Sequence, residues 1–383
     1  MKQLLKWSSG GGTKRICQNK YGGFDGLRAF AAIGIAIMHY LANIDETISE
    51  KLNNSGILYS EIVPFFTSFV FMFFTLSAFS MCCGYFHKFD TKDGKSSFCT
   101  ESFYNKRYSR IWPFFSLLVL IDFIMNPSKE ELYQCIADLT LAFNLLPNPE
   151  IHVIGVGWFL GVIFLFYMIF PWFAFLLQNT KRAWLAMGVS LIMHFLVVDY
   201  YLTEEFVLPS EISNFRHNIV WSFPFLMIGG LLFLYRGQLG RKEYRWIWLI
   251  VIVLGFIVQF KYHPVICGDN YMYMMLLFTV CICYTMTGGI KIFGIYLLDN
   301  KLMKFIGGLS MEIYLCHMVM FRVIEKVHLE NHIFNPHIYY WVLCTAGLLM
   351  AILFSWLVKK IMFPYISGKI VLVRKIIEKN NKE

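Results

Sequence analysis

Apolar and polar residues follow one another along this chain in long blocks. Apolar runs of roughly 17 to 25 residues, the length that crosses a bilayer, are separated by short polar and often basic segments. Each run is predicted to form a membrane helix, because a helix satisfies its own backbone polar groups. The ten predicted spans, two of them short, are Leu27–Ala42, Ile62–Tyr85, Ile111–Met125, Trp158–Leu177, Ala183–Tyr201, Ile219–Tyr235, Trp246–Phe260, Tyr271–Thr287, Phe305–Phe321 and Ile338–Met362. The polar-interrupted stretch Leu132–Leu146 is predicted to be interfacial or re-entrant.

Composition supports the same class. The chain is 57% hydrophobic and only 15% charged, whereas soluble domains average about 25% charged residues. We predict an all-α polytopic membrane protein with one bundle of about ten transmembrane helices. Its expected organisation is a polar cytoplasmic segment (1–20), a transmembrane domain (21–365) and a basic cytoplasmic tail (366–383). Residues 369–383 are expected to lie on the membrane surface as an amphipathic segment.

Basic residues predict the orientation. With ten spans, 28 of the 34 Lys and Arg residues fall on the side of the N-terminus. The positive-inside rule then places both termini in the cytoplasm of a multi-pass protein of the cell membrane. The net charge of +9 is thus explained by topology, so no nucleic-acid partner is expected. The ten cysteines show no metal-ligand spacing and are interpreted as small core residues, so no metal is predicted.

The first span carries the sharpest candidate chemistry. Arg28 and His39 are eleven residues apart. On a helix their side chains point within about 20° of the same direction around the axis and lie about 16 Å apart along it. Arginine binds phosphate oxygens and histidine accepts a proton from a hydroxyl near neutral pH. The pair therefore indicates a phosphorylated donor that enters from the cytoplasm and reacts at a base within the membrane. The alternative is a topology-setting arginine and a structural histidine.

A second cluster precedes the third span. Arg107 and Arg110 are three residues apart and share one helix face on the cytoplasmic side. They are candidate ligands for phosphates of the same donor, and lipid headgroups are the alternative.

Further segments give weaker signals. Trp158 lies between Gly157 and Gly161, which permit close helix packing, and Tyr167 follows in the same span. In the ninth span Ser310, Tyr314 and His317 share a narrow stripe, whereas Glu312 points to the opposite side. Thr75 and Ser77 are interpreted as packing residues, and Asp122 and His194 as isolated polar residues without an identified partner.

These segments, in this order, resemble the membrane-bound acyltransferase family 3, from about Tyr21 to His317. The resemblance rests on five motifs: Phe24-Asp25-Gly26-Leu27-Arg28 with His39, Phe73-Phe74-Thr75-Leu76-Ser77, Arg107-Tyr108-Ser109-Arg110-Ile111-Trp112-Pro113, Gly157-Trp158-Phe159-Leu160 with Tyr167 and Pro171, and Ser310-Met311-Glu312-Ile313-Tyr314-Leu315-Cys316-His317. Two departures are Gly161-Val162-Ile163, where many members have a glutamate, and Ala78 in place of a frequent glycine.

The resemblance implies an enzyme that transfers an acyl group, usually acetyl, from cytoplasmic acyl-coenzyme A to a carbohydrate outside the membrane or at its outer leaflet. His39 is then the catalytic base or acyl acceptor, and Arg28, Arg107 and Arg110 hold the donor. Supporting roles are expected for Asp25, Trp158, Tyr167, Ser310, Tyr314 and His317. Acyl-CoA serves as co-substrate, with no bound cofactor. The partners are the bilayer, a carbohydrate acceptor and, where acylation is indirect, separate proteins of envelope-glycan synthesis. The alternative from another class is a transporter or flippase of a lipid-linked or acylated saccharide.

Overall fold

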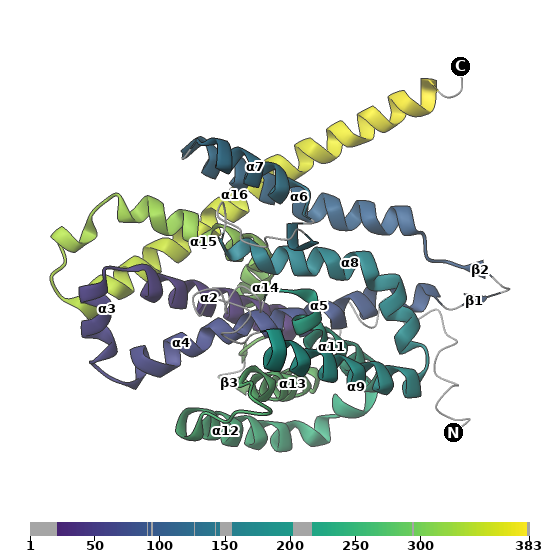
Figure 1. Cartoon of the computed structure of the whole chain (residues 1–383), viewed down its shortest axis with the longest axis horizontal. Helices are drawn as coiled ribbons and strands as arrows, with labels where there is room; N and C mark the ends of the chain where they lie inside the picture. The colour runs from purple at the N-terminus through teal and green to yellow at the C-terminus, as the bar shows by residue number, and fades with distance from the viewer. Residues whose placement is uncertain are drawn as a thin grey trace.

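The apolar segments form helices in the computed structural model (Figure 1). The structure describes residues 21–89, 91–92, 95–125, 127–141, 143–145, 155–201, 217–292 and 295–380. Its longer helices are α2 (Gly23–Asn43), α5 (Phe69–Tyr85), α6 (Thr100–Met125), α8 (Trp158–Leu177), α9 (Thr180–Leu196), α11 (Ile219–Leu239), α12 (Arg245–Tyr262), α13 (Tyr271–Met286), α15 (Ser310–Glu325) and α16 (Pro336–Asn380).

Short elements connect these helices. The short α-helices are α3 (Glu46–Asn53), α4 (Val63–Phe65), α7 (Lys129–Leu139) and α14 (Lys301–Gly308). Single turns of 3₁₀ or π helix are η1 (Leu58–Ile62), η2 (Phe66–Ser68), η3 (Phe86–Phe89), η4 (Phe143–Leu145), η5 (Gly155–Gly157), η6 (Val197–Tyr201), η7 (Lys242–Tyr244) and η8 (Leu329–Asn331). Two antiparallel hairpins complete the described part, β1 (Thr91–Lys92) with β2 (Lys95–Ser96) and β3 (Lys291–Ile292) with β4 (Ile295–Tyr296).

The helices match the predicted spans. In the described part of the chain, eight helical segments are long and apolar enough to cross a membrane. A ninth span is formed if α14 and α15, which meet at an angle of 69°, cross together. The remaining predicted span, Tyr271–Thr287, corresponds to the shorter apolar helix α13, of 16 residues. The all-α polytopic membrane fold is thus confirmed, and the cytoplasmic placement of the termini stays a prediction.

Helix α2 lies at the centre of the bundle, packed against α5, α14, α15 and α16, whereas α12 lies at its edge (Figure 1). The most apolar window of α2 is 67% buried, against 6% for α12. Glycines allow the closest approach. A Cβ on Gly26 would lie 2.1 Å from the carbonyl oxygen of Leu298, and one on Gly307 would lie 2.0 Å from that of Asp25. The first turn of α2 therefore rests directly on α14 and the segment before it.

The described residues of the stretch Leu132–Leu146 do not form a span of their own. Its helix α7 has 11 residues, too few to cross a bilayer. It packs against α6, where the indole Nε1 of Trp112 donates to the carbonyl of Leu139 over 3.0 Å. At the C-terminal end, α16 continues as one helix to Asn380 and extends away from the other helices (Figure 1). The expected position of residues 369–383 on the membrane surface stays a prediction.

Two polar residues interpreted as isolated have partners far away in the sequence. Asp122 Oδ1 pairs with Arg322 Nη1 at 3.1 Å, across 200 residues. The buried His194 bonds the carbonyl of Trp221 through Nδ1 and the carboxylate of Asp269 through Nε2, both at 2.7 Å. The interpretation of Asp122 and His194 as isolated was wrong, because only tertiary packing brings these partners together.

Candidate active site

A cavity of about 550 Å³ lies among α2, α5, α6, α8 and α15. It is within the size range of small-molecule sites. Five basic side chains and one carboxylate line it, together with polar and aromatic residues of the same helices. The charged residues are Arg28, Lys88, Lys106, Arg107, Arg110 and Asp25. The three arginines predicted from the sequence as donor ligands therefore face one space, whose described lining is strongly positive.

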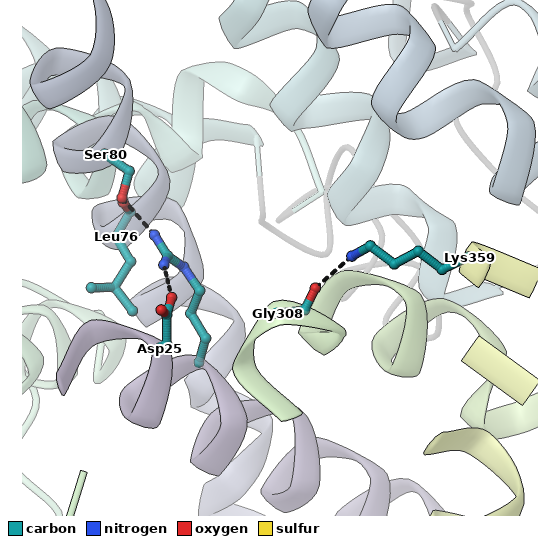
Figure 2. A network of polar contacts seen from close by, with 6 residues as sticks. Asp25, Leu76, Ser80, Gly308 and Lys359 are labelled. Atoms are coloured by element: carbon teal, nitrogen blue, oxygen red, sulfur yellow. Dashed lines mark hydrogen bonds and ion pairs between the residues drawn. The ribbon is translucent and has the colours of Figure 1, made fainter. Parts of the chain in front are cut away.

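Arg28 is held in place by two neighbouring residues. Its Nη1 donates to Asp25 Oδ1 at 2.9 Å, one turn earlier on α2, and its Nη2 donates to the hydroxyl of Ser80 on α5. The Ser80 hydroxyl in turn donates to the carbonyl of Leu76 at 2.6 Å. Figure 2 shows Asp25, Ser80 and Leu76 gathered around this guanidinium group. These contacts fix the guanidinium plane, so part of the ordering cost of binding an anion is met in advance.

Arg107 lies between two tyrosines. Its Nη2 donates to the hydroxyl of Tyr85 at 2.9 Å, and its guanidinium carbon lies 5.1 Å from the Tyr85 ring centre and 5.6 Å from that of Tyr167. Its Nε is buried and has no hydrogen-bond partner among the described residues. Tyr167, expected in a supporting role, thus orients a cation of the cavity.

Sequence reasoning missed the contribution of α5. Phe73, Ser77, Ser80, Gly84 and Lys88 all line the cavity. Their spacing of three or four residues puts them on one face of the helix and its 3₁₀ extension. This stripe of small and polar residues was a detectable signal. Thr75, in contrast, donates to the carbonyl of Phe225 at 3.0 Å and serves packing between α5 and α11.

Three aromatic side chains of the cavity pack against one another. Phe73, Phe159 and Tyr314 all line it, and their rings contact one another, with centroids 5.3 Å apart for Phe159 and Tyr314. Tyr314 also contacts the ring of His317, at a centroid distance of 6.0 Å. We call these three residues the aromatic triad. Through Tyr314 the triad links the lining of the basic cavity to the histidines described next.

His39 and His317 form a direct pair. His39 Nδ1 lies 2.9 Å from His317 Nε2, and His317 Nδ1 lies 2.6 Å from the carbonyl oxygen of Tyr314. His317 is fully buried and His39 is partly exposed. Neither histidine lines the described cavity. The shared helix direction of Arg28 and His39 therefore does not place both side chains in the described cavity, and Tyr314, which lines the cavity, contacts His317.

The remaining predicted residues divide into two groups. Ser310 lines the cavity at the first turn of α15, whereas Trp158 does not line it and instead stacks on His217 with centroids 4.0 Å apart. Glu312 is buried and pairs with Lys359 Nζ at 3.2 Å, away from His317. The same Lys359 ammonium donates to the carbonyl of Gly308 at 2.7 Å, as Figure 2 shows. Lys359 thus fixes the bend between α14 and α15, where the α15 part of the cavity begins.

Comparison with known proteins identifies the family. A family model described as an acyltransferase domain matches residues 21–359, nearly the whole described chain. No curated protein and no solved structure matches. The matched range contains the basic cavity, the aromatic triad and the histidine pair. This chain therefore belongs to acyltransferase family 3 and is a multi-pass membrane acyltransferase.

Proposed function

We propose that this protein transfers an acyl group, acetyl in the first instance, from cytoplasmic acyl-CoA to a hydroxyl of an extracytoplasmic or lipid-linked carbohydrate. The membrane is proposed to be the plasma or inner membrane of the cell. The observation that carries this proposal is the cavity with five basic side chains against one carboxylate, whose lining residue Tyr314 contacts His317, the hydrogen-bond partner of His39.

The charge of the cavity favours coenzyme A as the carrier. Its phosphate groups are polyanionic, and guanidinium forks bind phosphate oxygens in pairs. Arg28 and Arg107 are already oriented by Ser80 and Tyr85. In addition, α15 begins at the cavity with Ser310, and the N-terminus of a helix attracts anions.

The pantetheine arm would then extend toward the aromatic triad, which must part to admit the thioester. The acceptor hydroxyl would give its proton to His39 as its oxygen attacks the thioester carbonyl, and the thiolate of CoA would leave and take up that proton. Ser310 and Tyr314 are the candidates to stabilise the oxyanion. In the variant mechanism His39 itself carries the acyl group before the acceptor attacks.

Binding of acetyl-CoA tests the donor. Purified protein in detergent should bind radiolabelled acetyl-CoA, and Arg28→Ala should lose that binding. Arg241→Ala is the matched control, since Arg241 is exposed and lies outside the cavity. Equal binding by the Arg28→Ala and Arg241→Ala proteins would refute the donor site.

Mass analysis of surface glycans tests the reaction. Cells with the wild-type protein should carry acyl esters that cells with His39→Ala lack, at equal protein levels. A transporter or flippase would instead move unmodified glycan, and His39→Ala would leave that movement intact. Unchanged esters in the His39→Ala cells would contradict the enzyme mechanism.

A further inference from the structure

The hydrogen bonds around His317 determine where the ring protons lie. A carbonyl oxygen only accepts, so the 2.6 Å contact with the Tyr314 carbonyl requires a proton on His317 Nδ1. A neutral His317 then has a lone pair on Nε2. The 2.9 Å contact with His39 is made if His39 Nδ1 carries the proton and donates it. His39 Nε2 is left without a proton, which is the state that a general base needs.

We propose that His317 is a positioning residue that fixes His39 in the Nδ1–H tautomer and leaves Nε2 of His39 as the proton acceptor. The inference rests on the proposed function for its catalytic meaning, although the tautomer is a property of the resting protein. In free histidine the proton favours Nε2, so an unsupported His39 would present the wrong nitrogen. In chymotrypsin-type enzymes a carboxylate holds the catalytic imidazole in this way; here the acceptor is a second imidazole.

The histidine pair takes up one proton during the reaction and releases it again. When His39 Nε2 takes the hydroxyl proton, His39 becomes an imidazolium that still donates through Nδ1 to His317. The neutral His317 ring accepts this charge-assisted hydrogen bond, and its Nδ1–H stays on the Tyr314 carbonyl. The proton then passes from His39 Nε2 to the departing thiolate, and both rings return to their starting state.

The backbone around the pair is held as a positioning role requires. The Tyr40 hydroxyl donates to the carbonyl of His317 at 3.2 Å, and that of Tyr340 donates to the carbonyl of Ile37 at 2.9 Å. Gly347 of α16 meets the Tyr40 ring, where a Cβ would lie only 2.7 Å from ring atoms. These contacts tie α2, α15 and α16 together at the depth of the two histidines. Because His317 is fully buried, its ring cannot turn to water for another partner.

The proposal is tested by nitrogen-15 NMR of the full-length protein in lipid bilayers with labelled histidine. The His39 signals are assigned by difference from His39→Gln, among the ten histidines of the chain. Wild-type His39 should show a protonated Nδ1 and an unprotonated Nε2. In His317→Phe the proton should move to Nε2, whereas His317→Gln, whose side-chain oxygen can accept from Nδ1, should keep the wild-type pattern.

Kinetics of acyl transfer give the second measurement. His317→Phe should lower kcat by roughly 10²- to 10⁴-fold with little change in KM for acetyl-CoA, as expected for loss of an oriented base. His317→Gln should recover activity to within about tenfold of wild type. His332→Phe, at an exposed site, is the control for histidine replacement and should match wild type.

The two measurements separate the possible failures. A wild-type His39 that carries its proton on Nε2 would overturn the tautomer assignment while leaving acyl transfer intact. Absence of acyl transfer with the expected tautomer would instead refute the proposed function. If His317→Phe does not fold, His317→Gln still tests the positioning role. A His317→Gln protein that has wild-type activity while His39 carries its proton on Nε2 would exclude that role.

Discussion

Gly307→Ala is expected to separate α14 from α2 and to disturb the cavity. A Cβ at position 307 would lie 2.0 Å from the carbonyl oxygen of Asp25, far inside van der Waals contact, and the obstacle is backbone that cannot rotate away. Overpacking of this kind costs about 1–3 kcal/mol. Alanine gives back up to about 1 kcal/mol in a helix, so the net loss is of the order of 1–2 kcal/mol. Because Arg28 lies one turn after Asp25, the displacement also moves its guanidinium group.

The neighbouring glycine supplies the control. A Cβ on Gly308 would meet nothing within 4 Å, so Gly308→Ala should be neutral or slightly stabilising. Thermal unfolding of both variants in the same detergent measures the difference, expected as a fall in Tm of roughly 2–8 °C for Gly307→Ala alone. Equal Tm values for the two variants would refute the close α2–α14 contact.

Three further predictions concern side chains. Arg107→Lys keeps the positive charge but loses the planar guanidinium group and its hydrogen bond to Tyr85. The KM for acetyl-CoA should therefore rise roughly 10- to 100-fold, with kcat almost unchanged. A fall in kcat without a change in KM would contradict a role of Arg107 in donor binding. His194→Ala leaves the Asp269 carboxylate buried without its histidine partner. The free energy of unfolding, measured with denaturant, should therefore fall by about 3–5 kcal/mol. An unchanged denaturant midpoint would disprove the His194–Asp269 pair. Burial, with the nearby acidic side chains, raises the pKa of Asp138 to about 7. The folded protein therefore holds the Asp138 proton more tightly than the unfolded chain does. The free energy of unfolding should fall as the pH rises from about 4 to 7 and this proton is lost. Asp138→Asn should make the Tm nearly independent of pH over this range. A pH dependence of the Tm like that of wild type would show that another group is responsible.

The sequence predicted the elements well because crossing a bilayer constrains length and polarity within one segment. Arg28, Arg107 and Arg110 could be grouped because all three were predicted near one membrane face, and the structure brings them to one cavity. Tyr314 and His317 were placed on one stripe of their span. In the structure Tyr314 lines the cavity and His317 contacts His39. This difference depends on which helices lie next to each residue.

Contacts between helices could not be predicted from one sequence. His39 and His317 are 278 residues apart, and no local spacing indicates which helices are neighbours. The same holds for Arg322 with Asp122. The packing of the aromatic triad also escaped prediction, because its residues come from three different helices. The polar stripe on α5 is different, because its spacing was present in the sequence, although its member Ser77 was interpreted as a packing residue.

The central claim is that a thioester from the inner side and a hydroxyl from the outer side meet at His39. Proteoliposomes enclosing a cell-envelope glycan extract, with radiolabelled acetyl-CoA added outside, test it most directly. Vesicles with the cytoplasmic face of the protein outward should transfer label to the enclosed glycan, and His39→Gln should abolish that transfer. Transfer by His39→Gln at the wild-type rate, or only when glycan and acetyl-CoA share one compartment, would contradict the account.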